Sequence, residues 1–333
     1  MNRSRNRWAR LAALAVTLLL PAVAPAQTAP LAYVSNERSR DITVINTADD
    51  QVLATIAVES GRPRGIQVSP DGKTVYVALS DDAPRIEADD DAIVIIDAAT
   101  GTVKSRLPGG TDPEQFAVSP DGVRLYVANE DAGTASIIDL PTGQVIATLT
   151  VGIEPEGVAI SPDGRWIYVT AETSNTVSVI DSQKNRVVAS FLVDIRPRAA
   201  AFSPTEPRAY VTTELGSTLM VVDTDRHEVI DVIELESGEA KPVGVAVSPD
   251  GKKVYVANGH AGTVSVIDAA THQVIASVAV GKRPWGIAVS PDGEKIYTAN
   301  GLSSDVSVIE AATLQVIATV PAGEGPWGVA IGP

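Results

Sequence analysis

From residue 31 onward, the chain alternates between short hydrophobic runs and turns rich in Gly, Pro, Asn and Asp. Val, Ile, Thr and Tyr are frequent in the runs, and apolar and polar side chains alternate with a period of two, which is typical of β-strands. In the representative segment 243–280, the pattern predicts strands at 244–247, 253–257, 263–267 and 273–280. No window shows the spacing of an amphipathic helix. The pattern therefore predicts an all-β protein.

A Ser-Pro-Asp-Gly turn recurs along the chain and sets the size of a repeating unit. The turn has five full copies and one variant, Ser-Pro-Thr-Glu at 203–206. These six segments begin at Ser69, Ser119, Ser161, Ser203, Ser248 and Ser290. With the final Pro333 included, successive prolines of this series are 50, 42, 42, 45, 42 and 42 residues apart. The unit is therefore 42 residues long, with two insertions. Four strands in about 40 residues are typical of one β-propeller blade.

Each unit also contains a tyrosine-led second strand, and the order of strands indicates how the ring closes. Seven such strands occur, the first at Tyr33, and seven first strands begin near residues 65, 115, 157, 199, 244, 286 and 328. The chain after its leader begins with a second strand and ends with a first strand, so we expect 327–331 to pair with the sheet of residues 31–59. The prediction is one domain, residues 27–333. It is a seven-bladed β-propeller of four-stranded antiparallel blades, with the ring closed by pairing of the N- and C-terminal strands.

Residues 1–26 have the three parts of a secretory signal peptide. Four arginines are followed by the run Leu11–Leu20 and by the ending Ala24-Pro25-Ala26. A run of ten residues is too short for a membrane anchor, which needs about 20 apolar residues. We therefore predict cleavage after Ala26, a periplasmic or secreted protein, and no membrane span after cleavage.

Composition narrows the classes of function. The chain has no cysteine, which excludes disulfides, thiolate zinc sites, c-type haem attachment, cysteine nucleophiles and iron–sulfur clusters. Its 26 basic and 41 acidic residues give a net charge of −15, and loss of the four leader arginines leaves 22 against 41, or −19. Such a surface repels phosphate backbones, so we expect no nucleic-acid partner.

The Tyr-Val-x-Asn strand, the Val-Ser-Val-Ile-Asp strand and the Ser-Pro-Asp-Gly turn resemble the YVTN family of β-propeller repeats over residues 31–333. Within that family, the chain is most similar to the PQQ-dependent catabolism-associated β-propeller proteins. That closer similarity is carried by the segments 62–65, 112–116, 154–157, 194–198 and 326–328. It implies a periplasmic protein that accompanies an alcohol-oxidising quinoprotein system, with quinoprotein dehydrogenase or transporter components as partners.

This resemblance does not extend to binding of the cofactor. The stretch Asp97-Ala98-Ala99-Thr100-Gly101 faintly resembles part of a quinoprotein docking motif, but it lacks the partnering tryptophan downstream. We therefore do not expect this chain to bind PQQ.

The residue after the repeat proline should line the mouth of the central channel. Around the ring it is Arg64, Glu114, Glu156, Arg198, Val243, Trp285 and Trp327. A purely structural ring would be expected to repeat one residue type. In this ring, the charge of the residues changes sign in blocks, and two of the residues are tryptophans. Trp and Arg are frequent anchors of binding sites. The candidate ligand- or partner-binding residues are therefore Arg62, Arg64, Glu114, Glu156, Arg198, Trp285 and Trp327.

Two interpretations of this ring remain open. In the functional one, the arginines bind a carboxylate and the tryptophans bind an apolar or aromatic body. In the structural one, the tryptophans plug the channel and the charges form a solvated rim of compensating pairs. The asparagines that end the second strands are attributed to turns with positive φ.

Acidic residues suggest a metal site in two places. Glu130, Glu172 and Glu214 end consecutive second strands on the predicted mouth, and the segment 81–91 contains six acids in eleven residues. Asp89, Asp90 and Asp91 are candidate calcium ligands in this insertion. Neither place contains a spaced calcium-loop motif. A solvated acidic face is therefore favoured for the three glutamates, and a like-charged loop is favoured for the segment 81–91.

Three functions are compatible with these residues. The leading hypothesis is an exported, non-enzymatic propeller that binds a small ligand or partner at its funnel mouth, in the service of PQQ-dependent alcohol catabolism. The first alternative is a lactonase-like hydrolase that uses Glu114 or Glu156 with Arg64 and His260. The second is a cell-surface adhesion propeller, which is disfavoured because no cell-wall sorting tail follows Pro333.

Overall fold

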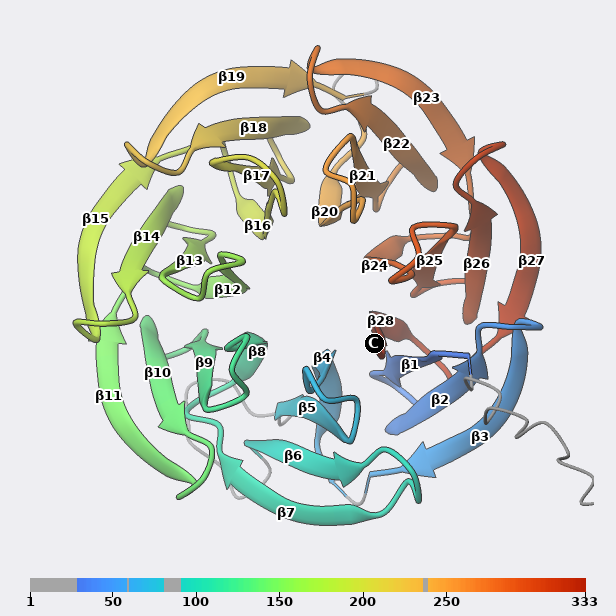
Figure 1. The fold of residues 1–333 in the computed structure, drawn as a ribbon, viewed down its shortest axis with the longest axis horizontal. Coiled ribbons are helices and arrows are strands. Elements are labelled where there is room, and N and C mark those ends of the chain that lie inside the picture. The colour runs from blue at the N-terminus through green and yellow to red at the C-terminus, as the bar shows by residue number, and fades with distance from the viewer. Residues whose placement is uncertain (1–28, 59, 81–90, 236–238) are drawn as a thin grey trace, which may run out of the picture.

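The structure, a computed structural model, describes residues 29–58, 60–80, 91–235 and 239–333. These residues form 28 strands in seven four-stranded sheets that are arranged around one axis (Figure 1). No helix is found among them, and so none that could span a bilayer. The predicted all-β, seven-bladed architecture is confirmed. The predicted signal peptide lies outside the described residues.

Each blade runs from an inner strand beside the axis to an outer strand at the perimeter (Figure 1). The inner strands are β4 (Arg62–Val68), β8 (Pro113–Val118), β12 (Pro155–Ile160), β16 (Pro197–Phe202), β20 (Pro242–Val247), β24 (Pro284–Val289) and β28 (Pro326–Ile331). The second strands are β1 (Leu31–Asn36), β5 (Thr74–Ser80), β9 (Arg124–Asn129), β13 (Trp166–Ala171), β17 (Arg208–Thr213), β21 (Lys253–Asn258) and β25 (Lys295–Asn300).

The third strands are β2 (Asp41–Asn46), β6 (Ala92–Asp97), β10 (Thr134–Asp139), β14 (Thr176–Asp181), β18 (Thr218–Asp223), β22 (Thr263–Asp268) and β26 (Asp305–Glu310). The outer strands are β3 (Gln51–Ala57), β7 (Val103–Pro108), β11 (Gln144–Thr150), β15 (Arg186–Leu192), β19 (Glu228–Glu234), β23 (Gln273–Ala279) and β27 (Gln315–Pro321). We number the blades from the one that contains β1.

Blade 1 contains both ends of the described chain. Its sheet order is β28-β1-β2-β3, and Val34 pairs with Val329 in an antiparallel ladder between β1 and β28. The two strands lie side by side near the axis in Figure 1. The predicted closure of the ring by the terminal strands is confirmed, and it lets the first and last parts of the chain complete one sheet.

Apolar side chains of the second and third strands fill the spaces between neighbouring blades. The second-strand tyrosines Tyr126, Tyr168, Tyr210, Tyr255 and Tyr297 are almost completely buried. The outer strands instead expose many side chains, in agreement with a sheet that packs against its neighbours but faces solvent at the perimeter. The core is therefore a ring of interfaces between blades.

Glycine after the ring residue allows the inner strands to approach one another closely. A Cβ atom added to Gly157 would lie 2.2 Å from the backbone oxygen of Arg198, and one added to Gly244 would lie 2.4 Å from that of Trp285. Gly65 and Gly286 have equivalent contacts at 2.7 Å with Glu114 and with Trp327. Such distances exclude a side chain, so the repeated glycine is explained by packing around the axis.

Basic side chains on four second strands connect neighbouring blades at the rim opposite the mouth. Each donates to a backbone oxygen of the next blade: Arg124 to Ser182 (2.6 Å), Arg208 to Ala269 (3.0 Å), Lys253 to Ala311 (3.1 Å) and Lys295 to Thr47 (2.7 Å). In blade 1 the equivalent position is Leu31, which has no such donor. The interface between blades 1 and 2 therefore lacks this side-chain connection.

Candidate functional site at the channel mouth

All seven predicted candidate residues lie where the inner strands begin, at one end of the central channel. The ladder between inner and second strands is interrupted directly after the proline, for instance between Pro155 and Val158. Glu156 and the residue after it are therefore outside the ladder. Such a bulge changes the direction in which a side chain points. Similar irregularities occur after Pro63, Pro113, Pro197, Pro242 and Pro284.

The two tryptophans of the ring pack against each other in the mouth. Their ring centroids are 6.0 Å apart, and Val243 completes a small apolar cluster with them. Trp327 is 3% exposed and Trp285 is 9% exposed. The Arg64 guanidinium lies 5.7 Å from the Trp327 ring centroid, so Trp285, Trp327 and Arg64 are neighbours in the mouth.

The arginines of the ring are already paired with carboxylates of the protein. Arg198 contacts Glu156 at 3.4 Å, Glu214 at 2.8 Å and Glu172 still more closely. Its guanidinium also lies 4.9 Å from the centroid of Trp285. Carboxylates of the protein therefore already neutralise Arg198, so a ligand anion would have to share its guanidinium with them.

Arg64 and Arg62 are paired in the same way on the other side of the ring. Arg64 lies 3.1 Å from Glu114, and Arg62 lies 3.0 Å from Glu37. Burial alone would lower the pKa of Arg64, but the nearby carboxylates of Glu114 and Glu37 more than offset it, so the pKa is raised. Arg64 therefore keeps its charge inside the mouth.

Carboxylates expected on a solvated rim are buried instead. Glu114, Glu156 and Glu172 are 1%, 4% and 4% exposed. Glu172 tolerates burial because Arg196 (2.6 Å) and Arg198 both contact it. The prediction of a solvated rim is wrong for these three residues. They can be buried because neighbouring blades supply guanidinium groups, and sequence spacing does not reveal such neighbours.

Blade 3 carries an acidic cluster that has less positive charge around it. Burial raises the pKa of Glu114 well above its usual range and outweighs the attraction of Arg64. Burial, together with the charges of Glu156 and Asp112, raises the pKa of Glu130 to about 7. The mouth thus has two parts. The Arg198 cluster consists of Glu156, Arg196, Arg198, Glu172, Glu214 and Trp285, and the blade 3 cluster consists of Asp112, Glu114 and Glu130.

Charged residues before the ring prolines, rather than the asparagines that end the second strands, have left-handed backbone. The residue before the proline has φ between 45° and 60° in Asp112, Glu154, Arg196, Lys241 and Arg283. The second-strand asparagines do not, so that prediction is wrong. Asn258 instead donates to the hydroxyls of Thr263 and Ser265 across the following hairpin, at 2.9 and 2.8 Å.

Four further predicted residues have separate outcomes. His260 is exposed and its Nδ1 lies 3.2 Å from the backbone oxygen of Glu239. No hydrogen bond or ion pair joins it to Arg64, Glu114 or Glu156 within the described ranges. Asp89 and Asp90 lie outside the described residues. Asp91 lies inside them, is 8% exposed, and accepts a 3.2 Å hydrogen bond from the Asp112 backbone N–H.

A cavity of about 230 Å³ lies next to the ring residues, inside the channel. Inner strands of all seven blades line it, and its polar lining includes Gln67, Gln115, Glu156 and Arg198. The cavity can take only a small molecule. Trp285 and Trp327 also line it, so the mouth and the channel interior share residues.

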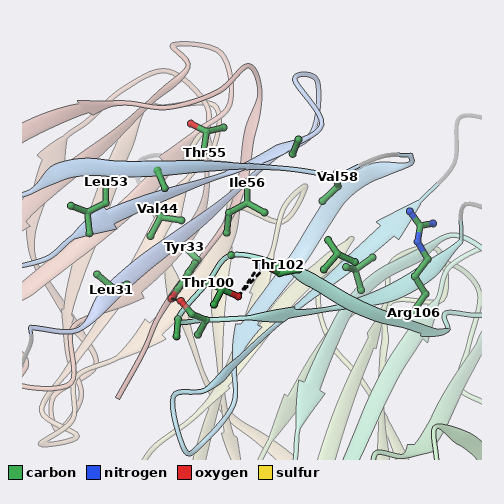
Figure 2. Close-up of a pocket in the computed structure, with 17 residues that line it drawn as sticks. Leu31, Tyr33, Val44, Leu53, Thr55, Ile56, Val58, Thr100, Thr102 and Arg106 are labelled. Atoms are coloured by element: carbon green, nitrogen blue, oxygen red, sulfur yellow. Dashed lines mark hydrogen bonds between the residues drawn. The ribbon is translucent and has the colours of Figure 1, made fainter.

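A larger hollow of about 740 Å³ lies away from the mouth, between blades 1 and 2. Figure 2 shows Leu31, Tyr33, Val44 and Ile56 on one side and Thr100 and Thr102 on the other. The Tyr33 hydroxyl donates to the Ala98 oxygen over 3.4 Å, and Leu31 occupies the position that is basic in four other blades. The hollow therefore lies where Leu31 replaces a connecting cation, and its lining is largely apolar on the blade 1 side.

Comparison with known proteins adds two partial matches to family models. Residues 194–315 match a family described as lactonase, 7-bladed beta-propeller, and residues 79–209 match the cytochrome D1 heme domain. No curated protein matches the chain.

Solved structures similar to this chain are β-propellers of comparable length. A protein from Bacteroides fragilis described as a putative 6-phosphogluconolactonase is 17% identical, with a TM-score of 0.76, and the alignment covers 93% of this chain and 100% of that one. A protein from Bacteroides uniformis with the same description is 19% identical, with a TM-score of 0.76, and coverage of 92% and 100%. A functionally unknown protein from Desulfotomaculum acetoxidans is 20% identical, with a TM-score of 0.75, and coverage of 90% and 98%. These similarities, with the observed blades, identify the chain as a seven-bladed β-propeller.

Proposed function

We propose that the protein hydrolyses a small cyclic ester at the channel mouth, with Arg198 and Glu214 as the principal groups. The observation that carries this proposal is the Arg198 guanidinium, held 2.8 Å from Glu214 and against the Trp285 ring. Both charged residues lie in the segment 194–315 that matches the lactonase model. The similar structures described as putative 6-phosphogluconolactonases add weak support.

The chemistry follows from the charges. Glu214 accepts a proton from water, whose oxygen adds to the ester carbonyl carbon. The Arg198 guanidinium stabilises the negative charge that develops on the carbonyl oxygen. The acyl carbon–oxygen bond then breaks, and the leaving alkoxide takes the proton held by Glu214, which restores the carboxylate and gives a hydroxy acid. Trp285 and Trp327 provide an apolar surface for the body of the substrate.

This assignment replaces the residues expected for a hydrolase from sequence. Glu114 and Glu156 are almost completely buried, whereas the Glu214 side chain is 16% exposed and accessible to water. His260 has its own contact with Glu239 and is not needed for the step. Glu214 is therefore the better placed base.

A panel of γ- and δ-lactones incubated with the purified protein tests the proposal, with hydroxy acid release as the measurement. Glu214→Gln should lower kcat by about 10²-fold or more, because it removes the base. The matched control is Glu206→Gln, which also removes a carboxylate from an arginine, Arg208, at 3.3 Å, but outside the mouth. Absence of turnover with every lactone, or equal loss in both variants, would refute the hydrolase assignment.

A second candidate function is non-enzymatic binding. Two buried polar atoms in the mouth, Trp327 Nε1 and Glu114 Oε1, have no hydrogen-bond partner, and unsatisfied buried polar atoms favour a bound ligand. In this proposal, the exported protein binds a small ligand or a partner protein in the periplasm. It would serve PQQ-dependent alcohol catabolism beside a quinoprotein dehydrogenase or transporter.

Binding is tested by the change in melting temperature with aromatic alcohols and their acids, and by pull-down of a purified quinoprotein dehydrogenase. Binding raises the melting temperature by mass action. A folded Trp285→Ala, Trp327→Ala double variant that binds as the unaltered protein does would contradict this candidate.

A further inference from the structure

The blade 3 cluster has the spacing of ligands around a metal ion. Asp112 precedes the proline of β8, Glu114 follows it, and Glu130 follows β9. One carboxylate oxygen from each lies within 4.8 Å of the other two. Calcium binds oxygen at about 2.3–2.6 Å, so oxygens on opposite sides of the ion are about 4.6–5.2 Å apart. The three carboxylates can therefore contact one ion without a rearrangement of the backbone.

Buried oxygen atoms at this place lack partners. Glu114 is 1% exposed; its Oε2 lies 3.1 Å from Arg64, but its Oε1 has no hydrogen-bond partner. Asp112 Oδ1 and the hydroxyl of Thr111 likewise have no hydrogen-bond partner, and the nearest cation to Asp112 Oδ1 is Arg62 at 3.8 Å. A buried carboxylate oxygen without a partner loses its hydration and gains nothing in return. Two carboxylate oxygens and a hydroxyl thus have unused capacity to bind a cation.

The positive charge near the cluster does not balance its acids. Arg62 and Arg64 both also contact Glu37, at 3.0 and 3.6 Å, and Arg62 is 3.8 Å from Asp112. In the described part of the chain, no ion pair joins Glu130 to a lysine or arginine. The neighbour on the other side is blade 4, which supplies further carboxylates.

The equivalent residue Glu172 in blade 4 has a different environment. Two arginines of blade 5, Arg196 and Arg198, contact its carboxylate. The unbalanced charge is therefore particular to blade 3 and is not a general property of this rim.

Backbone hydrogen bonds hold the cluster in place. The Asp112 N–H donates to Asp91 Oδ2 over 3.2 Å, and the Glu130 N–H donates to the Asp112 backbone oxygen over 3.2 Å. Asp112 has φ of 49°, a left-handed conformation that these contacts maintain. The ligands are therefore positioned before any ion binds, which lowers the entropic cost of binding.

We propose that Asp112, Glu114 and Glu130 bind one Ca²⁺ ion at the edge of the channel mouth. A set of oxygen donors alone favours a hard cation, whereas zinc prefers nitrogen and sulfur ligands. Mg²⁺ needs oxygens at about 2.0–2.1 Å in near-octahedral order, so it fits the observed spacing less well. The ion would neutralise the excess negative charge. This site is distinct from the Arg198 and Glu214 pair and does not depend on hydrolysis.

Isothermal titration of CaCl₂ into protein that has been freed of metal with EGTA and desalted tests the site. We expect binding to a site that requires Glu130, and a higher melting temperature with Ca²⁺ than with EGTA. Glu130→Gln should weaken this binding at least about tenfold, because it removes a charged ligand. Glu214→Gln, at the equivalent position of blade 5, should bind Ca²⁺ as the unaltered protein does.

Two controls keep the result interpretable. Glu130→Gln should fold in EGTA with an unchanged circular dichroism spectrum, since it removes a repulsive charge, and Asp112→Asn provides a second ligand variant. No saturable binding up to about 10 mM Ca²⁺ would overturn the proposal, as would unchanged binding in both ligand variants. Tighter binding of Mg²⁺ than of Ca²⁺ would overturn the assignment to calcium.

Discussion

Lys295 of blade 7 and Asp50 of blade 1 form an ion pair across the closure of the ring, with a distance of 2.8 Å between Nζ and Oδ2. The same ammonium group donates to the Thr47 backbone oxygen over 2.7 Å. The Tyr297 hydroxyl donates to Asp50 Oδ1, and burial together with that carboxylate raises the pKa of the tyrosine. Side chains of blade 7 thus reinforce the ring next to the blade that joins the chain ends.

Lys295→Met should therefore destabilise the fold by about 2 kcal/mol, because it removes hydrogen bonds from a charged donor and leaves a buried carboxylate with one partner fewer. Urea unfolding at pH 7 measures the effect. The control is Lys252→Met, since Lys252 is 79% exposed in a 3.5 Å pair with Asp250 and its loss should cost less than about 0.5 kcal/mol. Equal stabilities of the two variants would contradict the role of Lys295.

Leu31→Lys should stabilise the fold, in contrast to Lys295→Met. It places an ammonium where four other blades have a basic residue, within reach of the Ala98 oxygen in blade 2. A new hydrogen bond of this kind should add about 0.5–1.5 kcal/mol to the free energy of unfolding. Leu31→Met, which fills the same space without a donor, serves as the control. If the lysine variant is no more stable than the methionine variant, a basic side chain at position 31 does not connect blades 1 and 2 as predicted.

Gly244→Ala should destabilise the protein by about 1–3 kcal/mol, since its Cβ would lie 2.4 Å from the Trp285 backbone oxygen and force inner strands apart. Gly332→Ala is the matched control, because its Cβ would meet nothing closer than 3.7 Å. Thermal unfolding compares the two. A Gly244→Ala protein as stable as the control would mean that inner strands have room to separate.

Acid should weaken the repeated turns. The hydrogen bonds that Asp71 accepts from Ser69 and Lys73 lower its pKa to about 2, and the pKa values of Asp121, Asp163, Asp250 and Asp292 are lowered in the same way. These carboxylates therefore contribute stability above their unfolded pKa of about 4, and that contribution is lost as the pH falls towards about 2. Melting temperatures between pH 5 and pH 2 should show a decline.

Replacement of these five aspartates by asparagine should make that decline less steep. The substitution leaves an acceptor for the turn but removes the group that titrates. A variant with an unchanged pH dependence would show that acid acts elsewhere in the molecule.

Much of the fold was predictable because every blade repeats the same local rules. Period-two alternation, the Ser-Pro-Asp-Gly turn and the tyrosine-led strand each recur seven times or nearly so, and they concern residues close together in sequence. Even the closure followed from counting, because a chain that begins with a second strand and ends with a first strand leaves one sheet to complete.

The position of the candidate site was also predictable, but its chemistry was not. The seven ring residues follow from their place after the repeat proline. The contacts of Arg198 with Glu156, Glu172 and Glu214 do not, because these residues come from two neighbouring blades and the bulge after the proline sets the direction of Glu156 and Arg198.

The number of blades, the order of their strands, the closure and the end of the channel at which unlike residues gather can all be read from the amino-acid pattern. The pairing of charges, the burial of carboxylates and the excess of acids over cations in blade 3 emerge only in the folded ring. Alternation and turn hydrogen bonds act between residues close in sequence, whereas burial and charge pairing depend on neighbours that the closed ring brings together.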